Sequence, residues 1–400
     1  MASKHAVNWK YVLRKLVSVG PKVVGLSYVL KWCYGLLLND GKAAGGDFVV
    51  YWWAAHLVRD GAFSVLYDFT RFQESVKGVT GPESLFSWFY PPTFLLFILP
   101  FSVLPYSVSL VSWILITFVA YRQVVVRIAQ HHATTWLLLA FPATLLNIGY
   151  GQNGFLSAAL LGGGLLLLED HPYVAGVFLG LFTYKPQLAV LVPVALIFGR
   201  AWKAALAFAL SVGSLILLSC AIFGLNSWIG FWNNLSVAGQ IVRQGFHGQI
   251  QNWHNMISIF SSARLLRLDL VMAQAVQVVV MCGALLSVLW VWAKKSPLYI
   301  RGSTLAICAL LFSPYALEYD LALLALPIAW MGWHGYMKGW LYGEKIMLIV
   351  AWFMPLLSKW ILQFSNIQLI PVFMITLLAI ILRRAAKEMA PAPAKTTMVA

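Results

Sequence analysis

The sequence predicts an all-α, polytopic membrane protein, and its composition, its apolar runs and the placement of its basic residues support this. Of the 400 residues, 61% are hydrophobic and only 10% are charged. Soluble domains average roughly 45–50% apolar and about 25% charged residues. A soluble fold of this size has no means of covering so much apolar surface, whereas lipid is itself an apolar solvent.

Apolar runs recur along the whole chain with short polar breaks between them. Twelve of them are candidate spans: 22–38, 107–126, 133–148, 154–168, 173–184, 187–199, 204–223, 270–293, 302–313, 320–335, 346–360 and 366–382. Several are shorter than the ~20 residues that a straight span needs. The run 91–105 contains four prolines, which leaves open whether it is a re-entrant or interfacial piece or half of a longer span.

Basic residues indicate which ends of these runs face the cytoplasm. They gather at the N-terminus and in five later groups: Arg122 with Arg127, Arg200 with Lys203, Lys294 with Lys295, Lys338 with Lys345, and Arg383 with Arg384 and Lys387. The positive-inside rule places all of them on the cytoplasmic side. About twelve spans result, with both termini inside, provided that 91–105 does not cross fully. The net charge of +15 then faces anionic lipid, and we expect no binding to nucleic acid.

The chain is expected to form one transmembrane domain over residues 1–388 in the cell (inner) membrane. A Pro/Ala-rich cytoplasmic tail at 389–400 is expected to be disordered. Five polar segments fall on the opposite, extracytoplasmic side: 39–90, 147–154, 184–187, 224–269 and 313–320. These segments predict a single site. Six of the 13 acidic residues lie in the long loop 39–90, which makes this loop the first place to look for catalysis.

Asp47 is the sharpest candidate in that loop. It follows Gly45 and Gly46 and precedes a segment with the pattern of an amphipathic helix. One interpretation is a helix N-cap. The other is a general base at the membrane surface, which a helix N-terminus would help to keep ionised. The two interpretations are compatible.

Other polar residues have both a structural and a functional interpretation. Lys185 is either a snorkelling lysine or a cation for a phosphate. Glu318 and Asp320 would bind a metal, orient a sugar hydroxyl, or pair with Lys185 or Arg243. His254, expected at the start of a re-entry helix, is either structural or part of the site. Gln152 and Asn153 would hydrogen-bond a sugar or cap the helix that follows.

An ordered set of short motifs resembles glycosyltransferase family 87. These motifs are Gly46-Asp47-Phe48 with Tyr51-Trp52, Tyr90-Pro91-Pro92, Gly151-Gln152-Asn153-Gly154, Tyr184-Lys185-Pro186-Gln187, and Ser313-Pro314 with Tyr319-Asp320. They extend over about residues 40–335. The resemblance implies a GT-C-type helical bundle with a long, helical first extracytoplasmic loop that carries the catalytic aspartate, here Asp47. It implies a polyprenyl-phosphate sugar donor, mannose by family precedent, and a glycan or glycolipid acceptor.

Transfer from a lipid phosphate needs one base and groups that stabilise the departing phosphate, but no strong general acid. Asp47 fits the base, and Lys185 and Arg243 are the candidates for the phosphate. Residues expected to contact sugar or acceptor are Tyr51, Tyr90, Gln152, Asn153, His254, Glu318, Tyr319 and Asp320. No metal or cofactor is required, although Glu318 and Asp320 leave a metal-assisted variant open. The family often has histidine in the segment that matches 313–320, and its lack here leaves the acceptor open. The alternative function is a transporter or flippase of a lipid-linked glycan.

Overall fold

A computed structural model describes residues 9–38, 46–81, 86–244 and 251–389, and within these ranges the chain consists of helices and short connections, with one isolated bridge between Met256 and Leu317 and no strand. The N-terminal half contains α1 (Trp9–Leu38), α2 (Phe48–Arg59), α3 (Phe63–Leu66), α4 (Phe69–Thr80), α5 (Pro92–Ile98), η1 (Leu99–Val103), α6 (Tyr106–Ile128), α7 (Thr134–Leu139), α8 (Pro142–Tyr150), α9 (Gly154–Leu166), α10 (Pro172–Leu181), η2 (Phe182–Tyr184), α11 (Pro186–Ala189) and α12 (Leu191–Phe198). The rest of the chain forms α13 (Trp202–Phe223), α14 (Leu225–Gln244), α15 (Gln251–His254), α16 (Ile259–Leu265), α17 (Leu270–Ala293), α18 (Leu298–Phe312), η3 (Glu318–Leu324), α19 (Ala325–Lys338), α20 (Glu344–Ser365) and α21 (Ile370–Met389).

The predicted all-α class is confirmed. Among the described residues, four helices are long and apolar enough to cross a membrane, namely α6, α13, α17 and α20. Shorter apolar helices cover Pro92–Val103, Gly154–Leu166, Pro172–Tyr184, Pro186–Phe198 and Leu298–Phe312. Each of the twelve predicted runs corresponds to one or two helices, but the number of actual crossings stays a prediction.

Prolines mark places where the apolar sequence is divided into separate helices. The run 133–148 forms two helices, because Pro142 begins α8 directly after α7 ends. Pro186 likewise begins α11 and separates it from η2 at Lys185. Proline suits the first turn of a helix, where its missing N–H costs nothing. The run 91–105 is also two short pieces, α5 and η1, together too short to cross on their own.

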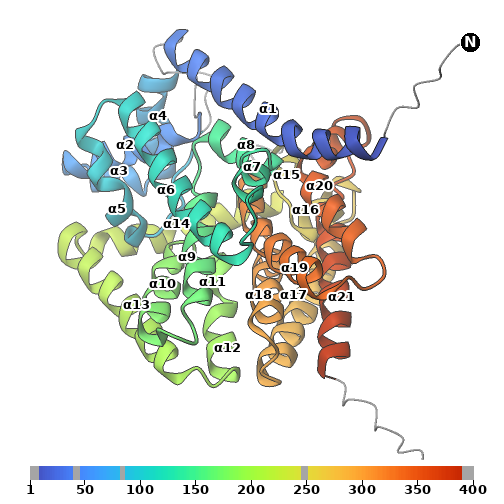
Figure 1. Cartoon of the computed structure of the whole chain (residues 1–400). Helices are drawn as coiled ribbons and strands as arrows, with labels where there is room; N and C mark the ends of the chain where they lie inside the picture. The colour runs from blue at the N-terminus through green and yellow to red at the C-terminus, as the bar shows by residue number, and fades with distance from the viewer. Residues whose placement is uncertain (1–8, 39–45, 82–85, 245–250, 390–400) are drawn as a thin grey trace, which may run out of the picture.

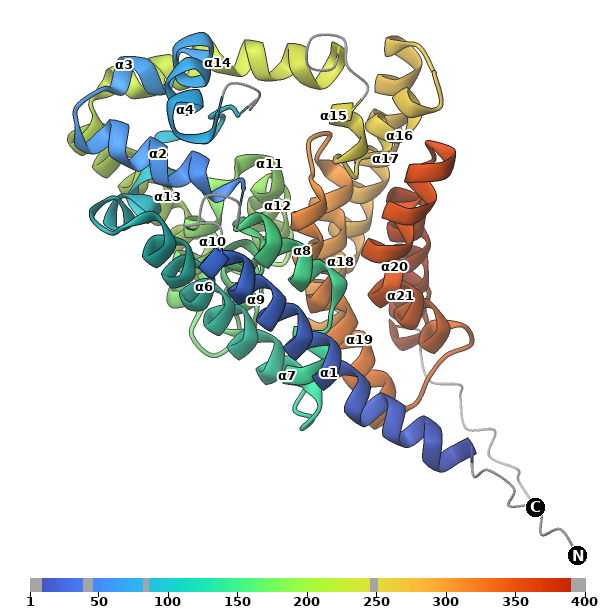
Figure 2. The same ribbon diagram turned by 90° about the horizontal axis from the view of Figure 1, so that it is seen from above.

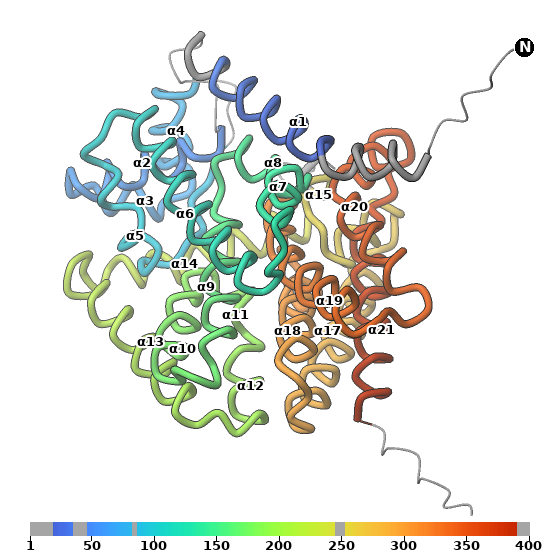
Figure 3. The backbone as a smooth tube through the Cα atoms, viewed as in Figure 1, coloured from blue at the N-terminus to red at the C-terminus, as the bar shows by residue number. Residues whose placement is uncertain are grey.

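The chain folds into two groups of helices that lie side by side. In Figures 1 and 2 the blue-to-green helices α2–α13 occupy one side, and the orange-to-red helices α18–α21 occupy the other. They meet where α12 packs against α17 and α18, α6 against α19, and α9 against η3. The long helix α1 crosses one edge of this assembly and packs against α7 and α8, as the backbone trace also shows (Figure 3). Polar segments that connect the helices of the two groups therefore meet near this junction.

The segments at 39–90 and 224–269, expected as extracytoplasmic loops, are largely helical. The first contains α2, α3 and α4, which confirms its expected helical character, and the second contains α14, α15 and α16. Figure 2 shows α3, α4 and α14 together at one end of the molecule. Of the tail predicted to be disordered, 389–400, Met389 is the last residue of α21, and 390–400 lie outside the described residues.

Helices α10 and α13 pack unusually closely because glycines face the contact. A Cβ atom added at Gly176 would lie 2.3 Å from the Ala204 carbonyl oxygen and 2.6 Å from the Ala207 Cβ. One at Gly180 would lie 2.5 Å from the Ser211 Cβ. Small residues at such contacts let helix backbones approach, which is a common source of stability in membranes.

We therefore expect Gly176→Ala to lower the free energy of unfolding by about 1–3 kcal/mol, since its methyl group would push into the α13 backbone. Gly213→Ala, on α13, is the matched control because a Cβ there meets nothing within 4 Å. Thermal unfolding of the two variants in detergent measures the difference. Equal stability of the two variants would contradict the close α10–α13 contact.

Candidate active site

A cavity of about 440 Å³ lies between the two groups of helices. Its lining residues are Asp47, Val50, Tyr51, Phe86, Ser87, Phe89, Tyr90, Pro91, Gln152, Lys185, Gln187, Ile241, Val242, Asn255, Met256, Tyr315, Leu317 and Tyr319. All five polar segments singled out in the sequence contribute to this list. The structure thus brings them to one place, as the single-site hypothesis expects, whereas the side of the membrane on which the cavity opens stays a prediction.

Asp47 is placed by the first turn of α2 but does not cap it. Its backbone occupies the N-cap position with helical angles (φ −76°, ψ −21°), and its side chain accepts no hydrogen bond from the helix. The carboxylate instead accepts a hydrogen bond from Gln152 Nε2 at 3.1 Å and lines the cavity. The capping interpretation is therefore wrong for the side chain.

The surroundings of Asp47 make its carboxylate more basic than that of an exposed aspartate. Burial raises its pKa above the ordinary value for aspartate, and the hydrogen bond from Gln152 lowers it again in part. Burial acts by disfavouring the charged form, and a donor to the carboxylate favours that form. The other described acids of the loop are elsewhere: Asp60 is exposed beside Arg59, Asp68 caps α4, and Glu74 is exposed.

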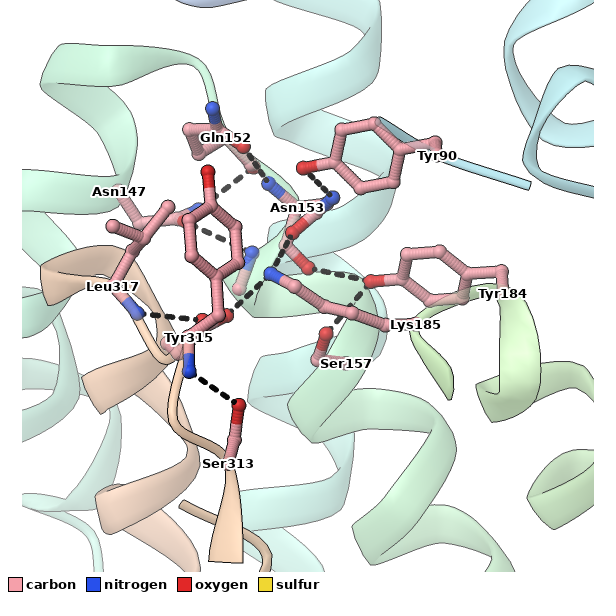
Figure 4. Close-up of polar contacts among 12 residues, drawn as sticks. Tyr90, Asn147, Gln152, Asn153, Ser157, Tyr184, Lys185, Ser313, Tyr315 and Leu317 are labelled. Atoms are coloured by element: carbon pink, nitrogen blue, oxygen red, sulfur yellow. Dashed lines mark hydrogen bonds and ion pairs between the residues drawn. The ribbon is translucent and has the colours of Figure 1, made fainter. Parts of the chain in front are cut away.

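Gln152 lies at the turn between α8 and α9. This turn is formed by Gly151, which has a left-handed backbone (φ 64°) and ends α8. Asn147 stabilises the turn, because its amide donates to the Gln152 carbonyl oxygen (3.2 Å) and its Oδ1 accepts from the Gly154 N–H (2.9 Å). Figure 4 shows this group. Gln152 Oε1 faces Tyr51, whose hydroxyl donates to it, so the amide lies between Tyr51 and Asp47.

Lys185 forms a buried ion pair with Asp320. The distance between Lys185 Nζ and Asp320 Oδ1 is 2.5 Å, and the two side chains are 2% and 0% exposed. The ammonium also donates to Asn153 Oδ1 (2.9 Å) and lies over the Tyr319 ring. The snorkelling interpretation is therefore wrong, and the expected pairing of Asp320 with Lys185 is confirmed. Figure 4 shows Lys185 directed toward Asn153.

Asn153 connects this ion pair to the aromatic wall. Its Nδ2 donates to the Tyr90 hydroxyl (2.9 Å), and its side chain is fully buried and does not line the cavity. Tyr184 donates to the Asn153 carbonyl oxygen and also bonds Ser157. Tyr90 and Tyr51 join their hydroxyls at 2.9 Å. A continuous set of hydrogen bonds thus runs from Asp320 and Lys185 to Asp47.

Glu318 is not among the residues that line the cavity. Its carboxylate pairs with Lys359 Nζ at 3.0 Å, and the lysine also donates to the Tyr150 hydroxyl (2.9 Å). Lys359 lies on α20, a predicted span, and the signal that would have identified it is a lone lysine within an apolar run. The structure thus separates Glu318 from Asp320, for which the sequence predicted a shared role.

Arg243 and His254 lie near the cavity without lining it. Arg243 is exposed near the end of α14, and its neighbours Ile241 and Val242 do line the cavity. His254 bonds Asn366 through Nε2 (3.1 Å), while its neighbours Asn255 and Met256 line the cavity. His254 ends α15, so the expectation that it starts a re-entry helix is wrong. Their roles in binding stay predictions.

Aromatic side chains form much of the cavity wall. Tyr51, Phe86, Phe89, Tyr90, Tyr315 and Tyr319 all line it. Phe86, Phe89, Gln187 and Asn255 were not predicted as site residues. Gln187 stands in the Tyr184-Lys185-Pro186-Gln187 motif and Asn255 follows His254, and these positions were the available signal. The two phenylalanines carried no signal that distinguishes them from core residues.

A second cavity, of about 490 Å³, lies between α6, α7, α19 and α20. Its walls are mostly apolar, with His131 and Lys345 among the lining residues and no carboxylate. Within the described part of the chain, no group of three or more His, Cys, Asp or Glu side chains is placed to hold a metal ion. A reaction that uses no metal stays a prediction.

Comparison with known protein families gives one match. The family model of Glycosyltransferase family 87 matches residues 88–314. This range includes Tyr90, Gln152, Asn153 and Lys185, but neither Asp47 nor Asp320. No curated protein and no solved structure matches the chain. The match covers more than half of the sequence and agrees with the motifs that meet at the cavity, and the chain therefore belongs to glycosyltransferase family 87.

Proposed function

We propose that this membrane glycosyltransferase moves a hexose, mannose by family resemblance, from a polyprenyl-phosphate donor to a glycan or glycolipid acceptor. The single observation that carries the proposal is the Asp47 carboxylate, which lines a 440 Å³ cavity rich in aromatic rings. Cavities of roughly 300–1,000 Å³ are typical of small-molecule sites. In the proposed topology, about twelve GT-C-type spans cross the cell membrane and the cavity opens on the extracytoplasmic side.

The composition of the cavity favours transfer over hydrolysis. Glycoside hydrolases use two carboxyl groups that flank the bond, at roughly 5–9.5 Å from each other. Among the described residues that line this cavity, Asp47 is the only carboxylate, and Asp320 is fully buried in its ion pair. A phosphate leaving group needs no strong acid, so one base is sufficient. Asp47 takes the proton from the acceptor hydroxyl as that oxygen attacks the anomeric carbon.

A single displacement accounts for the stereochemistry. The acceptor oxygen forms its bond to the anomeric carbon as the bond to the phosphate oxygen breaks, which turns a β-linked donor into an α-linked product. The phosphate leaves with both electrons of the broken bond, and its developing charge requires a cation or several donors. Arg243, exposed beside the cavity wall formed by Ile241 and Val242, is the cation proposed for this role. The aromatic wall suits the apolar faces of sugar rings.

We expect Asp47→Asn to lower the rate of transfer by roughly 10²–10⁴-fold, since it removes the proposed base while keeping a similar shape. Transfer from radiolabelled polyprenyl-phosphate mannose, by purified protein in lipid and with a panel of acceptors, measures it. Asp60→Asn is the matched control, because Asp60 is an exposed acid of the same loop. Full activity of Asp47→Asn would rule out the assigned base. Glycan translocation by wild type without transfer from any polyprenyl-phosphate sugar would favour the transporter.

The pH dependence of transfer should show one limb on the acidic side. Asp47 acts as a base only when ionised, and burial raises its pKa above the ordinary aspartate value. The rate should therefore fall as the pH decreases through this raised pKa, and this fall should begin at a higher pH than for an exposed aspartate. A pH profile of kcat/KM measures the limb. A rate that does not change down to the pH range of an ordinary aspartate would contradict the assignment.

Arg243→Met should lower kcat/KM for the donor roughly tenfold, through both a higher KM and a lower kcat, because the guanidinium is proposed to bind the phosphate and to stabilise its developing charge, and a hydrogen bond to a charged group is worth about 1.5–3 kcal/mol. Steady-state kinetics with varied donor concentration test this. Arg71→Met is the control, since Arg71 is an exposed cation of α4 that pairs with Asp68 away from the cavity. The same KM in both variants would remove Arg243 from the donor site.

A further inference from the structure

Five hydrogen bonds connect Lys185 to Asp47 without a gap. In order, they join Lys185 to Asn153 (2.9 Å), Asn153 to Tyr90 (2.9 Å), Tyr90 to Tyr51 (2.9 Å), Tyr51 to Gln152, and Gln152 to Asp47 (3.1 Å). The residues come from four separate segments, and we call them the hydrogen-bond chain. Figure 4 shows its first part, from Lys185 through Asn153 to Tyr90.

The Lys185 end determines the direction of the first two bonds. An ammonium group donates and cannot accept. Asn153 must therefore present Oδ1 to Lys185, which leaves its Nδ2 to donate to the Tyr90 hydroxyl. Because Tyr90 already accepts from Asn153, its own proton is free to be donated to Tyr51.

The Asp47 end independently determines the same direction. An ionised carboxylate only accepts, so Gln152 must present Nε2 to Asp47 and Oε1 to Tyr51. The backbone N–H of Asn153 also donates to that Oε1 at 3.4 Å. Tyr51 has one proton, and donating it to Gln152 requires that Tyr51 accept from Tyr90. Every bond in the chain therefore donates toward Asp47.

We propose that the buried Lys185–Asp320 pair is a positioning device, which holds the Gln152 amide toward Asp47 through this one-directional chain and so keeps the base ionised. The inference rests on the proposed function, because it assigns Asp47 as the base. It also gives Lys185 a role other than phosphate binding. The charge of Lys185 is balanced by Asp320, and its donors are directed at Asp320, Asn153 and the Tyr319 ring.

The protonation of Asp47 would oppose this arrangement. A protonated carboxyl that faces Gln152 with its O–H would need an acceptor there, and the amide would have to turn over. Turning it would direct Nε2 at the Tyr51 hydroxyl, which is already committed as a donor. The hydrogen-bond chain thus favours the ionised state of Asp47. The hydrogen bond from Gln152 favours the same state, because it lowers the pKa of Asp47.

The test measures the pKa of Asp47 directly and needs no transfer assay. The infrared band of the protonated carboxyl, isolated as the difference between wild type and Asp47→Asn in lipid, is followed as a function of pH. Tyr51→Phe removes the donor to Gln152 Oε1, so the amide is held less firmly toward Asp47, and the pKa of Asp47 should rise by up to about one unit, the scale of the Gln152 hydrogen bond to the carboxylate. Tyr121→Phe is the matched control, since Tyr121 is a fully buried tyrosine whose hydroxyl bonds the Ala322 carbonyl oxygen. Tyr121→Phe should leave the pH titration of the Asp47 infrared band unchanged.

The far end of the chain is tested with the double variant Lys185→Met with Asp320→Asn. The two changes together leave the net charge unaltered and leave no buried charge without a partner. The pKa of Asp47 should rise by about half a unit, and the acidic limb of kcat/KM should move with it while the donor KM stays within about twofold of wild type. An unchanged pKa in the double variant, or a raised donor KM without a pKa shift, would overturn the proposal.

The two proposals fail in different ways in these experiments. Wild-type turnover by Asp47→Asn would refute the proposed function, whatever the infrared titration shows. A transfer reaction that requires Asp47, combined with an Asp47 pKa that does not respond to Tyr51→Phe, would refute only the positioning role.

Discussion

The arrangement of the site depends on one buried ion pair, between Lys185 and Asp320. Two charged side chains that are almost completely removed from solvent are costly unless hydrogen bonds satisfy them. Here Asn153 accepts from the ammonium, and the Leu317 N–H donates to Asp320 Oδ2 at 3.1 Å. The pair therefore holds together three segments that lie far apart in the chain, 147–154, 184–187 and 313–320.

Backbone breaks within apolar helices make this pairing possible. A continuous helix directs its backbone bonds along its own axis, so backbone N–H and C=O groups become available to a site only where a helix stops. Pro186 begins α11 next to Lys185, and Gly151 ends α8 next to Gln152. Gly154 allows α9 to begin against η3, since a Cβ there would lie 2.2 Å from the Tyr319 carbonyl oxygen. We infer that the site forms at the positions where these helices are interrupted.

The helices and the segments that form the site could be predicted from the sequence, but the side-chain partners within the site could not. Run 270–293 matches α17, because apolar length and the Asp269 cap both act locally. The five polar segments were predicted together from the sidedness of basic residues. The partner of Glu318, however, is Lys359, and Asn153 turned out to be buried between Lys185 and Tyr90. Such contacts depend on how distant helices approach each other, which local patterns do not encode.

The distribution of charge also constrains where the donor can bind. Within the described lining of the cavity, Asp47 is negative and Lys185 is already neutralised by Asp320, so the cavity has no free positive charge to receive a phosphate. A phosphate placed against Asp47 would be repelled, and its charge would raise the pKa of the base further. The proposed mechanism therefore requires the sugar to enter the aromatic cavity while its phosphate stays outside, next to the exposed guanidinium of Arg243. Under that arrangement, the base and the leaving group contact different parts of the donor, as a displacement with inversion demands.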